Sequence, residues 1–302
     1  MLSFKRRIYA AISKKFMNDC SSYNSLEVRR GCRSKKQARA IFAAHEVPHA
    51  QGKIIFGPLA AHNFAKKHGF PLVIKPNVSG FSRGSYFPIN SYKELYKALF
   101  LAKIWWPTTV IEQYLQGKNY RVVVIDGEIM SAIERFPPTV VGNGVDSIRQ
   151  LAKTENEIRE EMGLFPTIHP ILETAQTINH LAKQGLSFNS VPAKGESVTL
   201  FYRIALAPGG TVHTIDKATI PLENKELFLK VLKMFNANIL GIDIIMEQGI
   251  DVPHDQQKCI MLEVNSRPYL KMHDVPRQGN REDLNQYYQK LDNLNISQSD
   301  TF

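Results

Sequence analysis

The sequence predicts an α+β fold, in which antiparallel sheets carry helices on one face. Two observations support this class. The expected strands come in hairpin pairs, and the expected helices lie between those pairs instead of alternating with single strands, as they would in a doubly wound parallel sheet. The length of 302 residues, with 43% hydrophobic and 22% charged residues, is typical of one elaborated domain or two closely packed lobes.

The first third of the chain contains three expected helices with clear end signals. Pro58 opens the second of them and Gly69 closes it, as proline and glycine commonly do at helix ends. Ser91 is the expected N-cap of the third, with Glu94 three residues later. We expect helices over residues 35–45, 58–68 and 91–103, and strands over residues 53–56, 71–75 and 108–113.

The rest of the chain alternates hairpins and helices. Asp126-Gly127 and Gly209-Gly210 are the expected hairpin turns. Residues 147–184 are expected to be mostly helical, with breaks at Pro166 and Pro170. We expect strands over 120–125, 128–134, 198–206 (the first half of a hairpin with 211–215), 239–246 and 259–264, and a helix over 223–236.

Positive charge is concentrated at the N-terminus. Residues 1–39 hold eleven Lys and Arg residues against Asp19 and Glu27, a net charge of +9 out of the total of +10. This segment is a solvated structural element, a transit peptide, or an attraction site for polyanions such as ATP, acidic substrates, nucleic acid or anionic lipid. The residues alone leave these three interpretations open.

The cysteines and the hydrophobic segments indicate a cytoplasmic protein without a membrane span. Cys20, Cys32 and Cys259 are odd in number and have no metal-ligand spacing, which favours reduced thiols. The best apolar run, residues 237–246, is short and contains Asp243.

Two apolar strands carry acids that a core strand rarely tolerates. Asp243 lies within the first, and Glu263 and Asn265 end the second, on one face because side chains alternate along a strand. Two carboxylates and an amide oxygen on neighbouring strands are suitable ligands for Mg²⁺ that holds nucleotide phosphates. The alternative is a solvent-facing sheet surface where the acids pair with lysines.

A second feature is an apolar strand that ends in Lys75, followed by a Gly/Ser loop. A lysine at a strand end can contact a phosphate, and such a loop can close over it. The loop has no Walker A spacing. Residues 80–84 also match the nucleophile elbow of serine hydrolases around Ser82, but the following residues 86–90 are expected to be extended, whereas the elbow requires a helix. Residues 142–144 before Ser147 are interpreted as a turn and a helix cap instead of a dinucleotide loop.

In this order, the segments resemble the ATP-grasp family, most closely the ATP-grasp part of cyanophycin synthetase and, more distantly, bacterial bifunctional glutathione synthetase. The resemblance covers about Phe4 to about Glu282 and depends on the order and spacing of several strings. They are KRRI at 5–8, SKK at 34–36, VIKP at 73–76, EQYLQGKNYRV at 112–122, VGNG at 141–144, QGL at 184–186, GID at 241–243, EVN at 263–265 and MHDVP at 272–276 with Gly279.

The resemblance implies two α+β lobes with antiparallel sheets that hold the nucleotide between them, and it implies roles. Asn119 stands where the family usually has an acid that binds the ribose hydroxyls. The implied nucleotide contacts are Lys35, Lys75, the lid loop with Gly80, Ser82 and Gly84, the adenine contacts Glu112, Gln113 and Leu115, and Asn119. Asp243, Glu263 and Asn265 would hold Mg²⁺, with Mn²⁺ as the other ion considered. Lys75 and Arg203 are the implied catalytic residues, and Arg267 and His273 the implied substrate or phosphate contacts.

The sequence also departs from the family. Ser79 and Ser82 occupy lid positions that are usually glycine, and an asparagine after Arg203 is missing. We expect no counterpart of the polymer-ligase half of cyanophycin synthetase, nor of most of its N-terminal domain. The expected division is a basic segment 1–33, a smaller lobe 34–116 with the lid, a larger lobe 117–287 with the metal site, and a polar tail 288–302.

The resemblance implies an ADP-forming carboxylate–amine ligase that forms an amide bond through an acyl-phosphate, on small amino-acid or peptide substrates. Three alternatives stay open: an ATP-grasp protein that binds nucleotide without ligase activity, a polyanion binder that uses its basic N-terminus, and the serine hydrolase. Nucleic acid is not the expected partner, and a homo-oligomer is left open.

Overall fold

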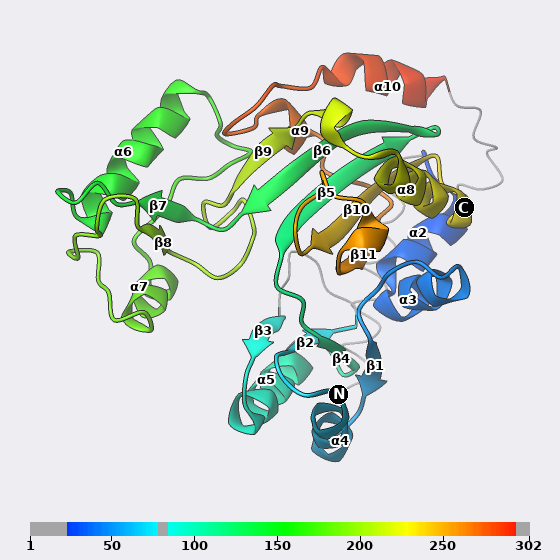
Figure 1. The fold of residues 1–302 in the computed structure, drawn as a ribbon, viewed down its shortest axis with the longest axis horizontal. Helices are drawn as coiled ribbons and strands as arrows, with labels where there is room; N and C mark the ends of the chain where they lie inside the picture. The colour runs from blue at the N-terminus through cyan, green and yellow to red at the C-terminus, as the bar shows by residue number, and fades with distance from the viewer. Residues whose placement is uncertain (1–22, 78–83, 294–302) are drawn as a thin grey trace.

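Two antiparallel sheets organise the molecule, and the computed structural model describes residues 23–77 and 84–293. The smaller sheet lies at the bottom of Figure 1 and the larger sheet above it. The smaller sheet has the order β1-β4-β2-β3. Its strands are β1 (Gly52–Ile55), β2 (Leu72–Pro76), β3 (Tyr86–Ile89) and β4 (Thr109–Gln113). All of its pairings are antiparallel, as predicted.

Two helices cover one face of the smaller sheet. They are α4 (Pro58–His68) and α5 (Tyr92–Trp105). α4 begins at Pro58 and ends before Gly69, whose φ of 73° suits glycine. The Ser91 side chain accepts a hydrogen bond from the backbone N–H of Glu94 and caps α5. Buried side chains from both helices and the sheet form the core of this lobe.

The larger sheet has the order β11-β10-β5-β6-β9, and again every pairing is antiparallel. Its strands are β5 (Lys118–Ile125), β6 (Glu128–Phe136), β9 (Thr211–Ile215), β10 (Ile239–Met246) and β11 (Cys259–Asn265). The β5–β6 hairpin turns at Asp126 and Gly127, with φ of 46° and 78°. Positive φ at both central residues matches the right-handed twist of the strands.

Helices cover both faces of the larger sheet, so the expectation of helices on one face is wrong for it. One face, with Tyr120, Val122 and Val124, packs against α8 (Leu222–Met234), α2 (Leu26–Arg33) and α3 (Lys35–Ala44). The residues Val123 and Ile125 point the other way and pack against α10 (Leu284–Asp292). α9 (Lys271–Asp274) lies on that side too, against β6 and β9.

A separate excursion leaves the larger sheet between β6 and β9 (Figure 1, left). It contains β7 (Thr139–Val141), α6 (Ile148–Glu161), α7 (Ala175–Ala182) and β8 (Ser197–Thr199). The expected strand over 198–206 is wrong beyond Thr199. β8 pairs with β7, while the long strand β6 extends to Phe136 and takes β9 along its edge. The hydrogen-bonding groups of 211–215 are therefore already paired.

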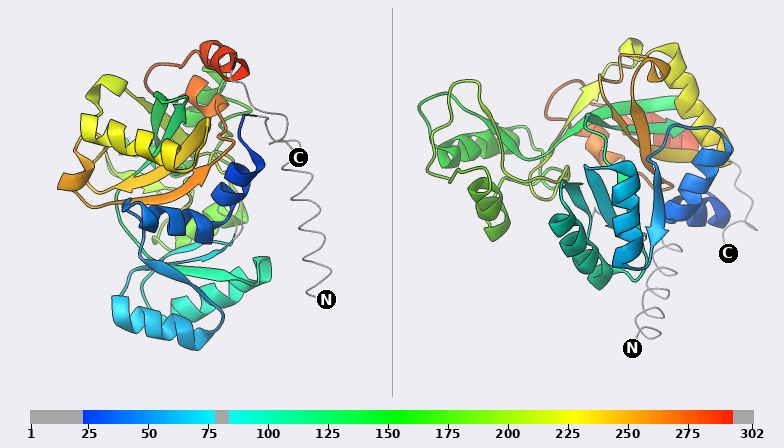
Figure 2. Two further views of the ribbon diagram at one scale, coloured as in Figure 1. Left: turned by 90° about the vertical axis from the view of Figure 1, so that its right-hand side faces the viewer. Right: turned by 60° about the horizontal axis from the view of Figure 1, so that its bottom comes forward.

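The segment α3 connects the two sheets. The expected division puts α3 in the smaller lobe, residues 34–116. In the structure its residues Ala38 and Phe42 pack in the core of the larger sheet. Figure 2 (left) shows α2 and α3 at the level between the larger sheet and the smaller lobe. Two short 3₁₀ helices complete the elements, η1 (Lys217–Thr219) and η2 (His254–Gln256). None of the helices in the described ranges combines the length and apolar character needed to cross a membrane.

Candidate active site

The smaller sheet contributes a buried carboxylate held by two cations. Glu112 on β4 is 3% exposed. Its Oε2 lies 2.5 Å from Nζ of Lys75 on β2, and its Oε1 lies 3.2 Å from Nη1 of Arg39 on α3. Both cations are themselves largely buried. The predicted adenine contact Glu112 and the predicted phosphate contact Lys75 therefore form one ion-paired group.

Strand register explains why these side chains meet. Val73 on β2 is the cross-strand partner of Glu112, and Lys75 follows two residues later, so Lys75 and Glu112 lie diagonally on one face. On the other side Glu112 pairs with Gly52 of β1. A Cβ at Gly52 would lie 2.5 Å from Cγ of Glu112 and 2.6 Å from Nη1 of Arg39. Glycine at position 52 makes room for this ion pair.

Lys35 connects this group to the larger sheet. Its Nζ lies 3.9 Å from Oε2 of Glu263 on β11. Burial lowers the pKa of Lys35, Glu263 and Glu112 oppose that shift, and the positive charge of Lys75 adds to it. Because Lys35 interacts electrostatically with residues of both sheets, the smaller and larger sheets contribute to one charged cluster.

The larger sheet contributes a second buried carboxylate with two cations. Asp243 on β10 is the cross-strand partner of Arg121 on β5. Nε and Nη2 of Arg121 donate to its two oxygens at 2.6 and 2.7 Å, and Nη2 of Arg135 on β6 lies 3.0 Å from Oδ2. Burial opposes ionisation of Asp243, but the two guanidinium groups outweigh burial and hold its pKa below the usual value.

The three predicted metal ligands lie on one face of the larger sheet, Asp243 in the middle of β10 and Glu263 and Asn265 toward the end of β11. Glu263 is the cross-strand partner of Asp243, and Asn265 follows on the same face opposite Gly241. Nδ2 of Asn265 is buried and has no hydrogen-bond partner. This side chain lacks a partner that a bound ligand could supply.

The donor set fits a divalent cation. Glu263 is partly exposed, and its one ion pair among the described residues is the 3.9 Å contact with Lys35. Oδ1 of Asp243 accepts one hydrogen bond, from Arg121. Its Oδ2 accepts a second hydrogen bond from Arg121 and forms an ion pair with Arg135. A carboxylate oxygen has two lone-pair positions, so Oδ1 keeps one for a metal. No group of three His, Cys, Asp or Glu residues within 23–77 and 84–293 could hold a metal, and the predicted set depends on the amide of Asn265.

Asn119, the predicted ribose contact, is buried on β5 opposite Arg135. Its Oδ1 accepts a hydrogen bond from Nε of Arg135 at 2.7 Å. Arg121 and Arg135 are therefore central to the site, although sequence reasoning gave them no role. Both stand on strands opposite predicted site residues, which is the signal that could have identified them once the register was known.

The two predicted substrate contacts differ in exposure. His273 on α9 is 0% exposed, and neither ring nitrogen has a hydrogen-bond partner. Burial, together with the charges of Arg121 and Arg135, lowers the pKa of His273 to about 3. The ring is therefore neutral and lies within the electrostatic influence of Arg121, Arg135 and Asp243. Arg267 follows β11 and is exposed.

Part of the predicted nucleotide site falls outside the described residues. Gly80 and Ser82 are among those positions. Gly84 is described and has a φ of 71°, and a Cβ there would lie 2.6 Å from the Trp105 ring. Gln113 and Leu115 are partly exposed at the connection between the sheets. The residues after Gly84 form the strand β3 instead of the helix that a nucleophile elbow requires.

The predicted catalytic residue Arg203 lies in the connection after β8. Its Nε donates to the hydroxyl of Tyr202 at 2.9 Å, and its guanidinium lies 5.2 Å from the centre of the Tyr202 ring. The Tyr202 ring also packs 6.0 Å from Phe87 of the smaller sheet. Among the described residues, Arg203 forms no ion pair with Asp243 or Glu263. It stands at a contact between the excursion and the smaller lobe.

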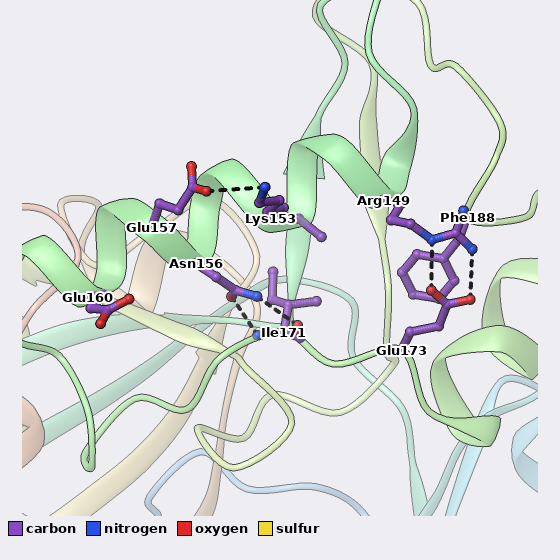
Figure 3. A pocket seen from close by; sticks show the side chains of 9 residues that line it. Arg149, Lys153, Asn156, Glu157, Glu160, Ile171, Glu173 and Phe188 are labelled. Atoms are coloured by element: carbon purple, nitrogen blue, oxygen red, sulfur yellow. Dashed lines mark hydrogen bonds and ion pairs between the residues drawn. The ribbon is translucent and has the colours of Figure 1, made fainter.

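A surface hollow on the excursion does not contain the predicted residues. The hollow has a volume of about 300 Å³ and lies along α6. Figure 3 shows Arg149 paired with Glu173 and Lys153 paired with Glu157 there. Asn156 bonds the backbone of Ile171 there. Its charged groups are mostly exposed and paired with each other, so the charged cluster between the sheets remains the candidate active site.

The fold is similar to those of solved structures of ligases and synthetases. The fold is similar to that of a bifunctional glutathione synthetase from Pasteurella multocida, with a TM-score of 0.63, 23% identity and coverage of 89% of this chain and 37% of that one. A D-alanine–D-alanine ligase from Bacillus anthracis gives a TM-score of 0.51 with 16% identity, over 82% of this chain and 60% of that one. No protein-family model matches the sequence.

Curated relatives carry the sequence similarity. Cyanophycin synthetase from Trichormus variabilis is 31% identical over 257 residues, which are 84% of this chain and 28% of the relative. The glutathione biosynthesis bifunctional protein from Clostridium perfringens is 32% identical over 213 residues, 69% of this chain and 27% of the relative. The chain thus spans less than a third of the length of the curated relatives it matches.

The fold and the ordered motifs define the class: the chain belongs to the ATP-grasp family, and the predicted α+β class is confirmed. Within that family its sequence is similar to a segment of cyanophycin synthetase, and the predicted resemblance is confirmed as well.

Proposed function

We propose that this chain is an ATP- and Mg²⁺-dependent carboxylate–amine ligase that forms an amide bond through an acyl-phosphate and releases ADP. Amino acids or peptides are the proposed substrate class, which the similarity to cyanophycin synthetase and to a glutathione biosynthesis protein supports. The proposed nucleotide position lies between the two sheets, with the division of the chain into lobes at residues 116 and 117.

One observation carries this proposal: the cluster between the sheets has an excess of positive charge. Five cations, Lys35, Arg39, Lys75, Arg121 and Arg135, stand against the three carboxylates of Glu112, Asp243 and Glu263, a surplus of two positive charges. All of these side chains except Glu263 are at most 14% exposed. Buried surplus charge is costly unless a ligand balances it, and a nucleotide triphosphate with its metal ion retains the required negative charge.

The proposed reaction has two steps. A carboxylate oxygen of the first substrate attacks the γ-phosphorus of ATP, and the bond to the β,γ-bridging oxygen breaks, which gives an acyl-phosphate and ADP. The nitrogen of an amine then attacks the acyl carbon, phosphate leaves, and the nitrogen loses a proton. The first step brings a carboxylate against the negative triphosphate, and the second develops negative charge on the acyl oxygen and the leaving phosphate, so both depend on positioning and on charge neutralisation.

The chain's own cations supply most of that neutralisation. Lys75 and Lys35 would contact the phosphates, and the ion pairs with Glu112 and Glu263 hold both side chains in place. Glu263, Asn265 and Oδ1 of Asp243 would hold Mg²⁺, which supplies Lewis-acid polarisation of the phosphate oxygens when bound. Arg203, beside Tyr202, would approach the phosphates from the excursion.

The free cysteines support the proposed cytoplasmic location. Cys32 and Cys259 are buried and form no disulfide in the described part of the chain. Burial raises the pKa of these thiols to about 12 and about 11, which keeps them protonated and inert.

A substrate screen tests the proposal. Amino acids and dipeptides are offered in pairs with ATP and Mg²⁺, ADP and phosphate release are measured, and mass spectrometry identifies the products. Glu263→Gln removes a metal ligand while it keeps the size of the side chain, so we expect ADP release to fall at least about a hundredfold. Undiminished turnover in this variant, in a folded protein, would refute the metal assignment.

The second candidate is nucleotide binding without ligase activity. Asp243 favours it, because three contacts with guanidinium groups already occupy most of its lone pairs. ATP binding with no amine-dependent phosphate release for any pair in the screen is the outcome that favours this candidate over the ligase.

A further inference from the structure

Arg135 joins two parts of the proposed site that are otherwise separate. Its Nε donates to Oδ1 of Asn119 at 2.7 Å, and its Nη2 lies 3.0 Å from Oδ2 of Asp243. The arginine side chain is 14% exposed. One planar guanidinium therefore contacts both the predicted nucleotide residue and the predicted metal residue.

The hydrogen bond determines which way the Asn119 amide faces. The Nε–H of arginine is a donor only, so the amide oxygen must be the atom that faces it. The NH₂ group of the amide then points away from Arg135 and can donate to a ligand, while Oδ1 keeps one lone pair beside Arg135. Among the described residues, only Oδ1 of this amide makes a hydrogen bond, and the NH₂ group makes none. The NH₂ group can donate to a ligand oxygen but cannot accept a hydrogen bond from a hydroxyl group.

The cost of burying Arg135 is balanced within the same network. Burial lowers the pKa of Arg135, Asp243 opposes this shift, and the neighbouring Arg121 adds to it. Asp243 is shared between Arg121 and Arg135. A change at either end of this network is therefore transmitted through the shared carboxylate to the other end.

We propose that Arg135 is a positioning residue that couples the nucleotide end of the site to its metal end, and that it sets the Asn119 amide to donate to a ribose hydroxyl oxygen. This inference rests on the proposed function, which puts the nucleotide beside Asn119. A carboxylate at position 119 would accept the hydrogen of the hydroxyl instead. The polarity of this one contact determines how strongly the site distinguishes ribose from deoxyribose.

Binding measurements without the ligase substrates test the inference. Dissociation constants for ATP, 2′-deoxyATP and 3′-deoxyATP are measured by calorimetry over a Mg²⁺ titration, for the wild type, Arg135→Lys and Asn119→Asp. Lysine keeps the positive charge, but a single ammonium group lacks the planar fork that reaches both partners. We expect Arg135→Lys to weaken ATP binding about ten- to a hundredfold and to raise the Mg²⁺ concentration needed for half-maximal binding.

The deoxynucleotides report the polarity of the contact. In the wild type the contact is a neutral hydrogen bond to one ribose hydroxyl. The affinity for ATP should therefore exceed the affinity for the deoxynucleotide that lacks this hydroxyl by about three- to tenfold. Asn119→Asp turns the contact into a charged acceptor and should increase that preference to about ten- to a hundredfold. In Arg135→Lys the amide is free to turn, and the preference should fall toward one.

Arg277→Lys is the matched control. The guanidinium of Arg277 makes two contacts with Glu155 at 3.0 Å, outside the proposed site. Its nucleotide affinities should equal those of the wild type. Circular dichroism and thermal unfolding check that each variant is folded. A purely structural role of Arg135 would lower stability without changing the ratio of ATP to deoxyATP affinity.

The outcomes separate the inference from the proposed function. A wild type that binds no ATP refutes the proposed function. A wild type that binds ATP, with Arg135→Lys unchanged in both affinity and Mg²⁺ dependence, overturns the inference and leaves the function standing. Should Arg135→Lys fail to fold, Asn119→Asp decides the matter: an unchanged preference for ATP over both deoxynucleotides would overturn the inference.

Discussion

Each sheet of the molecule holds one buried carboxylate between two cations, and the two arrangements differ in their cations. Glu112 in the smaller sheet pairs with Lys75 and Arg39, whereas Asp243 in the larger sheet pairs with Arg121 and Arg135. Both carboxylate side chains are 4% exposed. A lysine ammonium on its flexible stem can move toward water when it loses its partner, whereas the rigid planar guanidinium of an arginine is less able to do so. The arrangement around Asp243 should therefore tolerate less change.

The two arrangements also differ in where their members come from. Around Asp243 all three residues lie on adjacent strands of one sheet. Around Glu112 the cation Arg39 comes from α3, which packs against the other sheet. The first group is thus built within one lobe, and the second holds the smaller lobe to α3.

The largest effect is expected from Asp243→Ala. Two buried guanidinium groups would lose their counter-charge, and we expect the free energy of unfolding to fall by about 3–5 kcal/mol. Urea denaturation followed by circular dichroism measures the loss.

Glu112→Ala is the comparison variant for that experiment. Because the ammonium of Lys75 sits on a flexible stem and can move toward water when it loses its partner, this variant should lose about 2–3 kcal/mol, less than Asp243→Ala. An equal or larger loss in Glu112→Ala would show that the identity of the cations does not set the difference between the two arrangements.

A smaller effect is expected from Gly52→Ala. The added Cβ would meet Glu112, Arg39 and the carbonyl oxygen of Ile111 at 2.5 to 2.6 Å, so the Arg39–Glu112 pair must move. We expect a loss of about 1–3 kcal/mol in the free energy of unfolding. Gly31→Ala in α2 is the control, because its Cβ would have nothing within 4 Å. Alanine there should stabilise the helix by about 0.5–1 kcal/mol, and a loss at Gly31 similar to that at Gly52 would contradict the steric explanation.

The smallest effect concerns the pH dependence of the free energy of unfolding that His273 causes. The pKa of His273 is lowered to about 3 in the folded state by burial and by Arg121 and Arg135, which Asp243 only partly offsets. Between this value and the ordinary pKa of about 6.5 the unfolded chain binds the proton and the folded chain does not. Stability should therefore decrease as pH falls through this window. Between pH 6 and 5 His273 should contribute about 1 kcal/mol of that decrease.

His273→Leu removes this titrating group. The variant should lose less stability than the wild type between pH 6 and 5, by the amount assigned to His273, when urea denaturation is repeated at each pH. Identical pH dependence in the two proteins would mean that the ring already binds its proton in the folded state.

Local signals in the sequence were sufficient for most elements. Pro58 and Gly69 bound α4 at the predicted residues 58–68, and the apolar run of β10 covers the predicted residues 239–246. These signals act over a few residues, so they can be recognised without the rest of the fold. The strand predicted over 198–206 is wrong beyond Thr199, because its expected partner, residues 211–215, pairs with the long strand β6 instead. Neighbouring positions along the chain therefore did not identify the pairing.

The sequence by itself determined the family, the order of the elements and the presence of acids in two apolar strands. Only the tertiary structure decided which charges neutralise one another. Arg121 meets Asp243 through strand register, and Arg39 meets Glu112 through the packing of α3. The spacing of residues along the chain carries no information about either contact, because electrostatic pairing depends on distance in space and on the burial that the folded chain creates.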